Sequence, residues 1–544
     1  MINIKPITKF TNLGILLLLQ LFFIGCKTKS DTPPEPLLNT HGIIPLPKEF
    51  NFTREKITLT KDFIFVPNNT YPVVSAYAEE LINQTLNEYQ VSETATSNQT
   101  SFRIISDPSI PTEAYELSIT KNEILLKAGS ESGAFSALQS LKQYLWNCTS
   151  GLKQNAVTLP GITISDAPNY SWRGFHLDVA RHFFAKEYIL KIIDWLAYYK
   201  FNKFHLHLSD DQGWRIESKQ FPLLNTIGSW RAFDKYDSIC IAKATSNPDF
   251  KIDPRFIQIK NGITNYGGYY TQQDIAEIIA YAKDHFIEII PEVDMPGHLS
   301  AAIKAYPQLS CNGSTGWSTE FSYPLCPCNP DATQLAFQIW DEVAAQFPSP
   351  YAHIGADEVD KSTWSASALC PDFMKTNSLI SNNELQSFFV EKLQTHLETS
   401  GKTVIAWDDV TDGNVDPNLK IMYWRDWVPN APVKAAANGN QIIFTRWDLF
   451  YFSSPFSEEN LQKLLAFDIK QAYPTEVTNK IIGFQGCVWT EEIPSEAAFE
   501  AQVFPRLQAL SEVNWSSVKD YNSFTTRMIP HRAFLKANHV NLKH

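Results

Sequence analysis

The sequence predicts an α/β protein, a (β/α)8 TIM barrel preceded by a small α+β domain. After Pro168, short apolar runs that end in polar residues alternate with segments of helix length. Eight such runs are present, which is the strand number of a (β/α)8 barrel. The runs are Trp172–Asp178, Lys203–Asp210, Glu288–Asp294, Tyr351–Asp357, Thr403–Asp408, Lys420–Arg425, Gln441–Arg446 and Gly483–Trp489.

An open, doubly wound sheet is the competing α/β fold. Such a sheet usually has fewer strands and carries a glycine-rich phosphate-binding loop after one of them. The chain contains neither a G-x-G-x-x-G motif nor a P-loop. Between the first two runs, Lys186–Tyr199 places Ile189, Ile192, Ile193 and Leu196 on one face, as expected of a barrel helix. We therefore assign residues 166–544 to the barrel.

Residues 1–26 have the organisation of a secretory signal peptide. Lys5 and Lys9 give a positive start, and the apolar run Leu13–Ile24 leads into Gly25-Cys26. This end resembles a bacterial lipobox, which implies a lipoprotein whose mature chain begins at lipidated Cys26. An ordinary signal anchor is the alternative, but the apolar run is short for a membrane span. The expected location is the cell envelope, periplasmic or at the cell surface, with the membrane reached through the lipid alone.

Residues 27–40 are rich in Lys, Thr, Pro and Ser and predict a linker, and residues 41–165 predict the small domain. Several short alternating segments come before one helical segment, an order typical of α+β domains. No convergent set of polar groups occurs there, so the chemistry is expected in the barrel. The segments are Lys56–Pro67, Ser101–Ser106, Tyr115–Thr120 and Glu123–Lys127, followed by the helix Ser132–Trp146.

The amino-acid composition indicates a globular protein and argues against a nucleic-acid partner. The chain has 544 residues, 44% hydrophobic and 19% charged, which is normal for a globular protein. Its net charge of -12, without a basic tract, opposes binding to nucleic acid.

The chain has 8 cysteines. A secreted protein permits disulfides, and we expect Cys311 to pair with Cys326 or Cys328. A zinc site at Cys326-Pro-Cys328 is disfavoured because no second cluster of suitable spacing accompanies it.

Polar residues gather at the ends of all the predicted strands, where a TIM barrel has its active site. Carboxylates that accept hydrogen bonds from hydroxyls, and tryptophans that cover apolar C–H surfaces, suit a neutral sugar ring. A carbohydrate substrate is therefore predicted. These residues are Asp178, Arg181, His207, Asp210, Asp211, Glu292, Asp294, His298, His353, Asp357, Glu358, Trp407, Asp408, Trp424, Arg425, Tyr451, Trp489 and Glu491.

The fourth run ends in two adjacent carboxylates, Asp357 and Glu358. Glycosidases generally use two carboxyl groups about 5 to 9.5 Å apart across the scissile bond. Adjacent residues of an extended strand point to opposite faces, so this pair suits that mechanism poorly unless the strand tip bends. The alternative is substrate-assisted catalysis, in which one carboxyl group serves the leaving oxygen and the substrate's 2-acetamido oxygen is the nucleophile.

Five motifs in order resemble glycoside hydrolase family 20, the β-N-acetylhexosaminidases. The segment His353-Ile-Gly-Ala-Asp-Glu-Val359 is similar to the family's His-x-Gly-Gly-Asp-Glu signature, with Ala356 in place of the second glycine. The resemblance extends from about Ile43 to Trp515, so the first domain also resembles the family's small N-terminal domain. The other motifs are Leu177–Phe183, His205–Arg215, Pro291–His298 and Trp489–Glu491.

The resemblance implies an exo-acting, retaining enzyme without cofactor or metal, which acts on N-acetylhexosamine-terminated glycans through an oxazolinium intermediate. Glu358 is then the general acid/base, and Asp357 orients and polarises the acetamido group. Ser453 departs from the family pattern, where an Asp or Asn commonly contacts the sugar, so the gluco or galacto preference stays open. The implied substrate-binding residues are Arg181, Asp210, Trp407, Trp424, Tyr451, Trp489 and Glu491, and the supporting residues are Asp294, His298, His207 and His353.

Two other classes of function compete with this interpretation. A metal-dependent hydrolase would use His205 and His207, which alternation places on one face of a strand, with Asp294, His298 and His353. A surface glycan-binding lipoprotein would carry the same site in a degenerate form. Every identified catalytic position keeps its carboxylate, which favours an enzyme.

Overall fold

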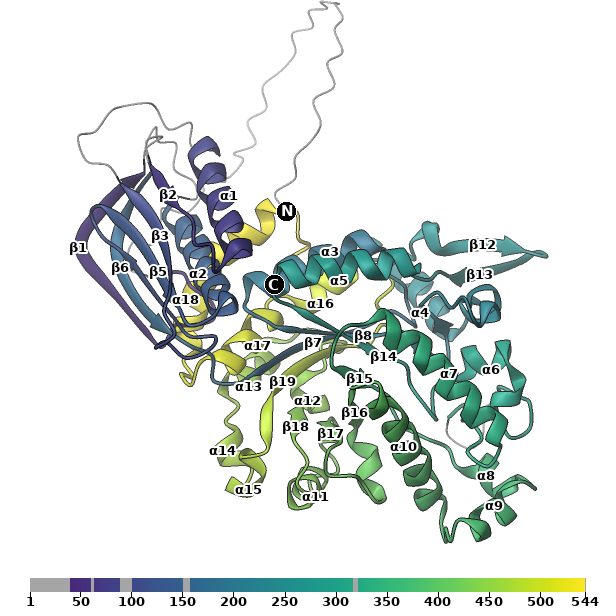
Figure 1. Ribbon diagram of the computed structural model, residues 1–544. Coiled ribbons are helices and arrows are strands. Elements are labelled where there is room, and N and C mark those ends of the chain that lie inside the picture. The colour runs from purple at the N-terminus through teal and green to yellow at the C-terminus, as the bar shows by residue number, and fades with distance from the viewer. Residues whose placement is uncertain (1–39, 60–62, 89–99, 150–156, 317–320, 544) are drawn as a thin grey trace, which may run out of the picture.

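Two sheets organise the molecule, an open one at the N-terminus and a closed barrel after it, as the computed structural model in Figure 1 shows. The structure describes residues 40–59, 63–88, 100–149, 157–316 and 321–543. The predicted signal peptide 1–26, its Cys26 and the linker 27–40 except Thr40 lie outside the described residues.

The N-terminal sheet is mixed, in the order β1-β6-β4-β5-β3-β2, and α2 packs on β4, β5 and β6. This agrees with the predicted α+β class. The predicted segment Lys56–Pro67 is in fact parts of two strands, which lie at opposite edges of the sheet. The elements are β1 Glu49–Leu59, β2 Ile64–Val66, α1 Pro72–Glu88, β3 Ser101–Ser106, β4 Tyr115–Ile119, β5 Glu123–Ala128, α2 Glu131–Thr149 and β6 Val157–Asp166.

The predicted barrel is confirmed. Its parallel strands close in the order β14-β15-β16-β17-β18-β19-β7-β8, and each predicted run overlaps one of them. All but β7 stop before the last residue of the predicted run, which leaves terminal polar residues in the loops of the rim, and β19 begins two residues before its run. They are β7 Trp172–Asp178, β8 Lys203–His207, β14 Glu288–Glu292, β15 Tyr351–His353, β16 Thr403–Trp407, β17 Lys420–Tyr423, β18 Ile442–Phe444 and β19 Ile481–Val488.

Helices surround this barrel (Figure 1). The predicted first helix is α3, Lys186–Tyr198, and its four predicted apolar residues are all buried. The others are α4 Lys235–Ala244, α5 Gln272–Asp284, α6 Ser300–Ala305, α7 Pro330–Gln346, α8 Ser362–Ala366, α9 Cys370–Thr376, α10 Asn382–Thr399, α11 Ala431–Asn438, α12 Trp447–Phe450, α13 Glu458–Ala466, α14 Ile469–Ala472, α15 Thr475–Thr478, α16 Glu496–Val503, α17 Arg506–Trp515 and α18 Tyr521–Ala537.

Five short strands lie outside the two main sheets. In Figure 1 the hairpin β12–β13 projects from the side of the barrel away from the N-terminal sheet. These strands are β9 Ser209–Asp210, β10 Gly213–Trp214, β11 Trp230–Ala232, β12 Ile257–Lys260 and β13 Ile263–Gly267.

A buried polar cluster joins the two domains. Asp166, at the end of β6, accepts a hydrogen bond from Trp515 Nε1 of α17 at 2.8 Å and from Tyr115 of β4 at 2.6 Å. The ammonium of Lys200, just after α3, lies 3.2 Å from the same carboxylate, and neither side chain of this ion pair is exposed. The small domain is therefore bonded to the barrel through groups removed from water.

Two disulfides, Cys311–Cys326 and Cys328–Cys370, lie beside the rim. The first is one of the two pairings expected for Cys311. Both cysteines of Cys326-Pro-Cys328 are thus in disulfides and cannot act as thiolate ligands. Cys148, Cys240 and Cys487 are free among the described cysteines.

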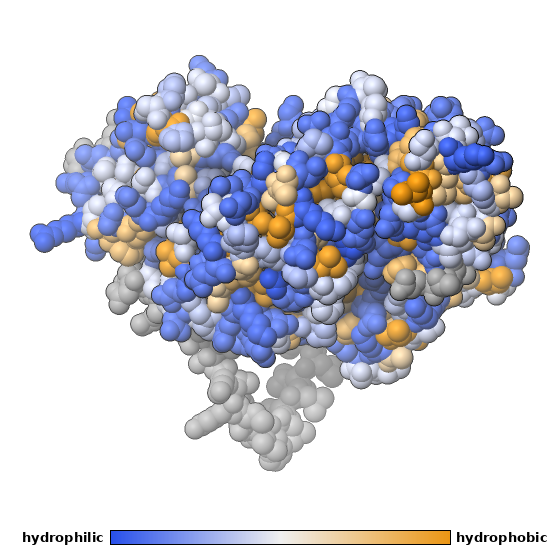
Figure 2. Space-filling model, turned by 90° about the horizontal axis from the view of Figure 1, so that it is seen from below, coloured by the Kyte–Doolittle hydropathy of each residue, from blue (hydrophilic) through white to orange (hydrophobic). Residues whose placement is uncertain are grey.

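Within the described part of the chain, every helix is too short or too polar to cross a membrane. On the face seen in Figure 2, hydrophobic residues are scattered among hydrophilic ones.

Candidate active site

The two adjacent carboxylates lie beyond the end of β15, in a bent segment. β15 stops at His353, and Gly355, Ala356 and Glu358 all have positive φ, of 67°, 71° and 50°. Ala356 holds this conformation through two hydrogen bonds: its N–H donates to Asp294 Oδ1 at 2.9 Å, and its carbonyl accepts from Gln386 Nε2 at 2.8 Å. The extended geometry expected from the sequence is therefore wrong here: the strand tip bends, which is the stated exception under which adjacent carboxylates need not point to opposite faces.

Gly355 is required by close packing as well as by its φ. A Cβ at this position would lie 1.9 Å from Asp294 Oδ1, a distance that no side chain tolerates. Because that oxygen also accepts from Ala356, Gly355 lets the carboxyl group of Asp294 approach the bent backbone. The predicted supporting residue Asp294 thus helps to shape the segment that carries Asp357 and Glu358.

Asp294 and Asp357 form a buried carboxyl pair. Asp294 Oδ2 and Asp357 Oδ1 have no hydrogen-bond donor among the described residues. Burial raises the pKa of both groups well above the ordinary aspartate value, and the neighbouring Asp294 raises the pKa of Asp357 further. We therefore expect the two side chains to share a single proton, which would satisfy both oxygens.

Asp294→Asn is expected to test this shared proton. Its amide keeps an oxygen for Ala356 and supplies an N–H for Asp357, so it should hold Asp357 as an anion to lower pH. Since the pKa of Asp294 is raised in the folded state, the wild type loses stability as the pH rises above about 4, whereas the variant does not. We expect the Tm advantage of the variant to reach roughly 1–4 °C at pH 7 and to vanish near pH 4. An advantage that did not change with pH would contradict the shared proton.

His298 faces both catalytic candidates. Its Nε2 lies 3.4 Å from Glu358 Oε2 and 3.8 Å from Asp357 Oδ2, so the two carboxylates turn toward one ring nitrogen. Its Nδ1 lies 3.4 Å from Asp210 Oδ1. Burial lowers the pKa of His298, but the surrounding carboxylates outweigh that effect and raise it well above the ordinary value. His298 is therefore a cation between acids at neutral pH.

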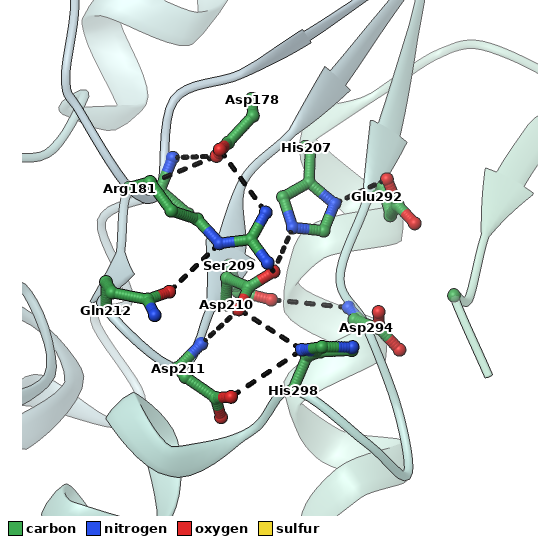
Figure 3. A network of polar contacts seen from close by, with 12 residues as sticks. Asp178, Arg181, His207, Ser209, Asp210, Asp211, Gln212, Glu292, Asp294 and His298 are labelled. Atoms are coloured by element: carbon green, nitrogen blue, oxygen red, sulfur yellow. Dashed lines mark hydrogen bonds and ion pairs between the residues drawn. The ribbon is translucent and has the colours of Figure 1, made fainter. Parts of the chain in front are cut away.

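Asp210 joins His298 to Arg181 and His207, as Figure 3 shows. Arg181 Nη2 lies 2.8 Å from Asp210 Oδ2 and its Nη1 lies 3.3 Å from Asp178 Oδ2. Arg181 Nε donates to Gln212 Oε1 at 2.9 Å, and its guanidinium lies 5.0 Å from the ring centroid of Trp489. The arginine is thus fixed on three sides beside an aromatic face.

Three histidines of the metal-dependent alternative, His205, His207 and His353, are turned inward toward Glu292. His205 and His207 both face Glu292 of β14, with ring nitrogens 3.0 and 2.6 Å from Glu292 Oε2. The second ring nitrogen of His207 lies 2.7 Å from Asp210 Oδ2. His353 Nδ1 lies 3.0 Å from Glu292 Oε1. Since carboxylates occupy both nitrogens of His207, it does not form a free metal-binding pair with His205.

The three predicted tryptophans and Tyr451 lie together. Trp407 and Trp489 have ring centroids 5.8 Å apart, and Tyr451 stacks on Trp424 at 6.1 Å. Tyr451 also lies 6.2 Å from Trp489. These aromatic side chains come from the ends of β16, β17 and β19 and from the loop after β18, so they form one wall.

Ser453 and Glu491 complete the predicted region. The Ser453 hydroxyl accepts a hydrogen bond from the backbone N–H of Trp489 at 2.7 Å, so it fixes the tryptophan backbone. Burial raises the pKa of Glu491, and the neighbouring Arg181 opposes this shift. Glu491 therefore lies on the Arg181 side of the site.

Sequence reasoning missed Asp409, which follows the expected Asp408. Asp408 binds Arg425, with Oδ2 2.8 Å from Nε. Asp409 also lies 3.5 Å from Arg425 Nε, but it alone of the two accepts from the Glu358 backbone, at 3.3 Å, and from Trp424 Nε1, at 2.9 Å, so it joins the bent segment to the aromatic wall. Nothing in the sequence distinguishes the two neighbours, because the turn after β16 decides which carboxylate faces the site.

Comparison with known proteins decides the family. The model of "Glycosyl hydrolase family 20, catalytic domain" matches residues 170–518, and that of "Glycosyl hydrolase family 20, domain 2" matches residues 40–167. The chain belongs to glycoside hydrolase family 20. Family 20 relatives include a beta-hexosaminidase of Porphyromonas gingivalis, 33% identical over 76% of this chain and 52% of that protein. A beta-hexosaminidase of Akkermansia muciniphila is 28% identical over 80% of this chain and 86% of that protein.

A solved family 20 structure has the same fold over nearly the whole chain. The exo-β-N-acetylglucosaminidase of Vibrio harveyi, in complex with N-acetylglucosamine, aligns with a TM-score of 0.78 and 28% identity. The alignment covers 93% of this chain and 78% of that one. The chain spans about half the length of the Porphyromonas gingivalis relative, 52%.

Proposed function

We propose that this family 20 chain is an exo-acting, retaining β-N-acetylhexosaminidase. The observation that carries the proposal is the unequal setting of the two adjacent acids. The Glu358 side chain is 32% exposed, whereas that of Asp357 is 9% exposed and paired with Asp294. Glu358 therefore reaches the open side of the site, as a proton donor to the leaving oxygen must. Asp357 lies beneath it, as a residue that holds the acetamido group must.

The proposed reaction has two steps. Glu358 protonates the glycosidic oxygen while the substrate's acetamido oxygen attacks C1, so the bond to the leaving alcohol breaks and an oxazolinium forms. Asp357 accepts a hydrogen bond from the acetamido N–H and stabilises the positive charge. Glu358 then takes a proton from water, which attacks C1 and reopens the ring with net retention. Arg181 and Glu491 bind ring hydroxyls, and Trp407, Trp424, Trp489 and Tyr451 enclose the acetamido group. The sequence also suggested Asp210 as a sugar contact, but its buried carboxylate is occupied by Arg181, His207 and His298, so its role is to hold Arg181.

The proposal is tested by aryl β-glycosides of N-acetylglucosamine, N-acetylgalactosamine and glucose. The two acetamido sugars should be released, the glucoside should resist, and an oxazoline-mimicking thiazoline should inhibit. The first product should be the β-anomer, which NMR detects. Similar rates on the glucoside would exclude acetamido participation, and binding of N-acetylglucosamine without hydrolysis would favour the glycan-binding alternative. Loss of activity on exhaustive chelation would favour a metal-dependent hydrolase.

We further propose that the enzyme is a lipoprotein of the cell envelope. Its support is the lipobox-like Phe23–Cys26, and the two disulfides suit an oxidising compartment. Cys26→Ala should move the full chain from the detergent phase to the aqueous phase in a Triton X-114 partition. Cys148→Ala, which removes a free thiol of the described part, is the matched control and should stay with the detergent. An unchanged partition of Cys26→Ala would overturn the anchor.

A further inference from the structure

Glu292 is a fully buried carboxylate at the end of β14, and its two oxygens have different partners. Oε2 lies 2.6 Å from His207 Nδ1. Oε1 accepts a hydrogen bond from Trp407 Nε1 at 2.8 Å. One side chain beneath the rim is thus bonded to two separate parts of the site.

The Oε2 branch leads to the Arg181 side (Figure 3). From Glu292 it passes through His207 to Asp210, which holds Arg181 at 2.8 Å and faces His298 at 3.4 Å. Burial acts against a charged His207, but Glu292 and Asp210 outweigh it and raise its pKa to about 10. His207 is therefore an imidazolium at neutral pH, and each of its N–H groups donates to one carboxylate.

The Oε1 branch leads to the aromatic wall. An indole nitrogen is only a donor, so its hydrogen bond to Glu292 fixes one orientation of the Trp407 ring. Trp407 is fully buried and contacts Trp489 in the same wall. The plane of the Trp407 ring therefore depends on the position of the Glu292 carboxylate.

We propose that Glu292 is a positioning residue that sets the hydroxyl-binding side and the acetamido wall of the site relative to one another. Glu292 does not itself reach the bound sugar: through Oε1 it bonds Trp407 of the wall, and through Oε2 it reaches Arg181 by way of His207 and Asp210. This inference rests on the proposed hexosaminidase function, because it assigns Arg181 and Trp407 to opposite parts of one bound sugar.

Other titratable groups also face Glu292. They are His176 of β7, His205 of β8, His353 of β15, Cys487 of β19 and Asp294, two residues beyond the end of β14. Burial lowers the pKa of His176 well below the ordinary value and that of His205 to about 4. Both imidazoles are neutral at neutral pH, whereas His207 is charged and answers to a change at Glu292.

Glu292→Gln is the test. The amide oxygen of Gln can still accept a hydrogen bond from Trp407 Nε1. Its NH2 group, however, faces the N–H of His207, so the hydrogen bond between residue 292 and His207 is lost. We expect kcat/KM on an aryl N-acetylglucosaminide to fall by about 10- to 100-fold, the cost of a small misplacement of binding groups. The basic limb of the pH profile should also shift to lower pH, because His207 loses a carboxylate that keeps it charged. Glu292→Asp, which retains the charge, should restore that limb.

Glu288→Gln is the matched control. Glu288 lies on the same strand at its opposite end, where it binds Lys203 and accepts from Ser349 at 2.9 Å. The Glu288→Gln variant should keep the wild-type kcat/KM and the wild-type pH limbs. If Glu292→Gln fails to fold, Trp407→Phe tests the other branch: it should weaken thiazoline binding without moving the basic limb.

A Glu292→Gln enzyme that folds, keeps its kcat/KM within about threefold of the wild-type value and keeps its pH limbs would overturn the inference. A Trp407→Phe enzyme with unchanged affinity for the thiazoline would also overturn it. Calorimetric binding of N-acetylglucosamine, measured on the same variants, separates this failure from that of the proposed function. If the wild type binds the sugar without turnover, the hydrolase proposal fails, while a binding loss in Glu292→Gln but not in Glu288→Gln still supports the positioning role.

Discussion

Glu358→Gln is expected to reduce kcat by about 10²- to 10⁴-fold on a substrate with a poor leaving group, which is the usual contribution of general acid catalysis. Gln keeps the size of the side chain and its place beside His298 but cannot donate a proton to the glycosidic oxygen. An aryl glycoside whose phenol is strongly acidic needs little protonation, so its first step should lose far less. The measurement is kcat on both substrates, with Tm recorded to show that the variant is folded.

The contrast between leaving groups is the decisive part of that experiment. Equal losses on both substrates would mean that Glu358 contributes something other than a proton to the departing oxygen. Near-normal turnover of the poor substrate would remove Glu358 from the mechanism altogether.

Asp357→Asn is expected to reduce kcat/KM by about 10²- to 10³-fold, as loss of one preorganised electrostatic contact does in other active sites. The amide fits beside Asp294 but does not carry the negative charge that stabilises an oxazolinium. Affinity for the thiazoline inhibitor should fall in parallel. Since burial and Asp294 raise the pKa of Asp357, removal of its charge should not lower Tm at pH 7.

Retention of thiazoline affinity in Asp357→Asn, together with a slow rate, would mean that the residue does not bind the acetamido group. A large fall in Tm would mean that the carboxylate stabilises the fold. In that second case the loss of rate would say nothing about the oxazolinium.

The barrel could be predicted because each strand combines a buried apolar run with a polar end, and this pattern is local in the sequence. The site could be predicted in part for the same reason: Arg181, Asp210, His298 and Trp407 all stand at strand ends. The shape of the segment after β15 could not be predicted from the sequence. It depends on Asp294 and Gln386, which lie on other elements and whose hydrogen bonds hold Ala356 at positive φ.

Glu292 shows a second limit of sequence reasoning. Its position at a strand end gives it the same local pattern as the residues proposed to bind sugar. Only the closed barrel shows that it faces four histidines and a tryptophan in the interior. Asp408 and Asp409 show the same limit, because identical neighbours acquire different partners through one turn of backbone.

The bond between Asp166 and Lys200 has a consequence for how this architecture is inherited. Two family models divide the chain at this boundary, as if the parts were separable modules. A barrel made alone would keep Lys200 and Trp515 but lose Asp166 and Tyr115, so the ammonium would open to water instead of being paired and buried. Transfer of the barrel to other partners therefore leaves this buried ion pair unmade, and the two modules are expected to travel together and to unfold in one transition.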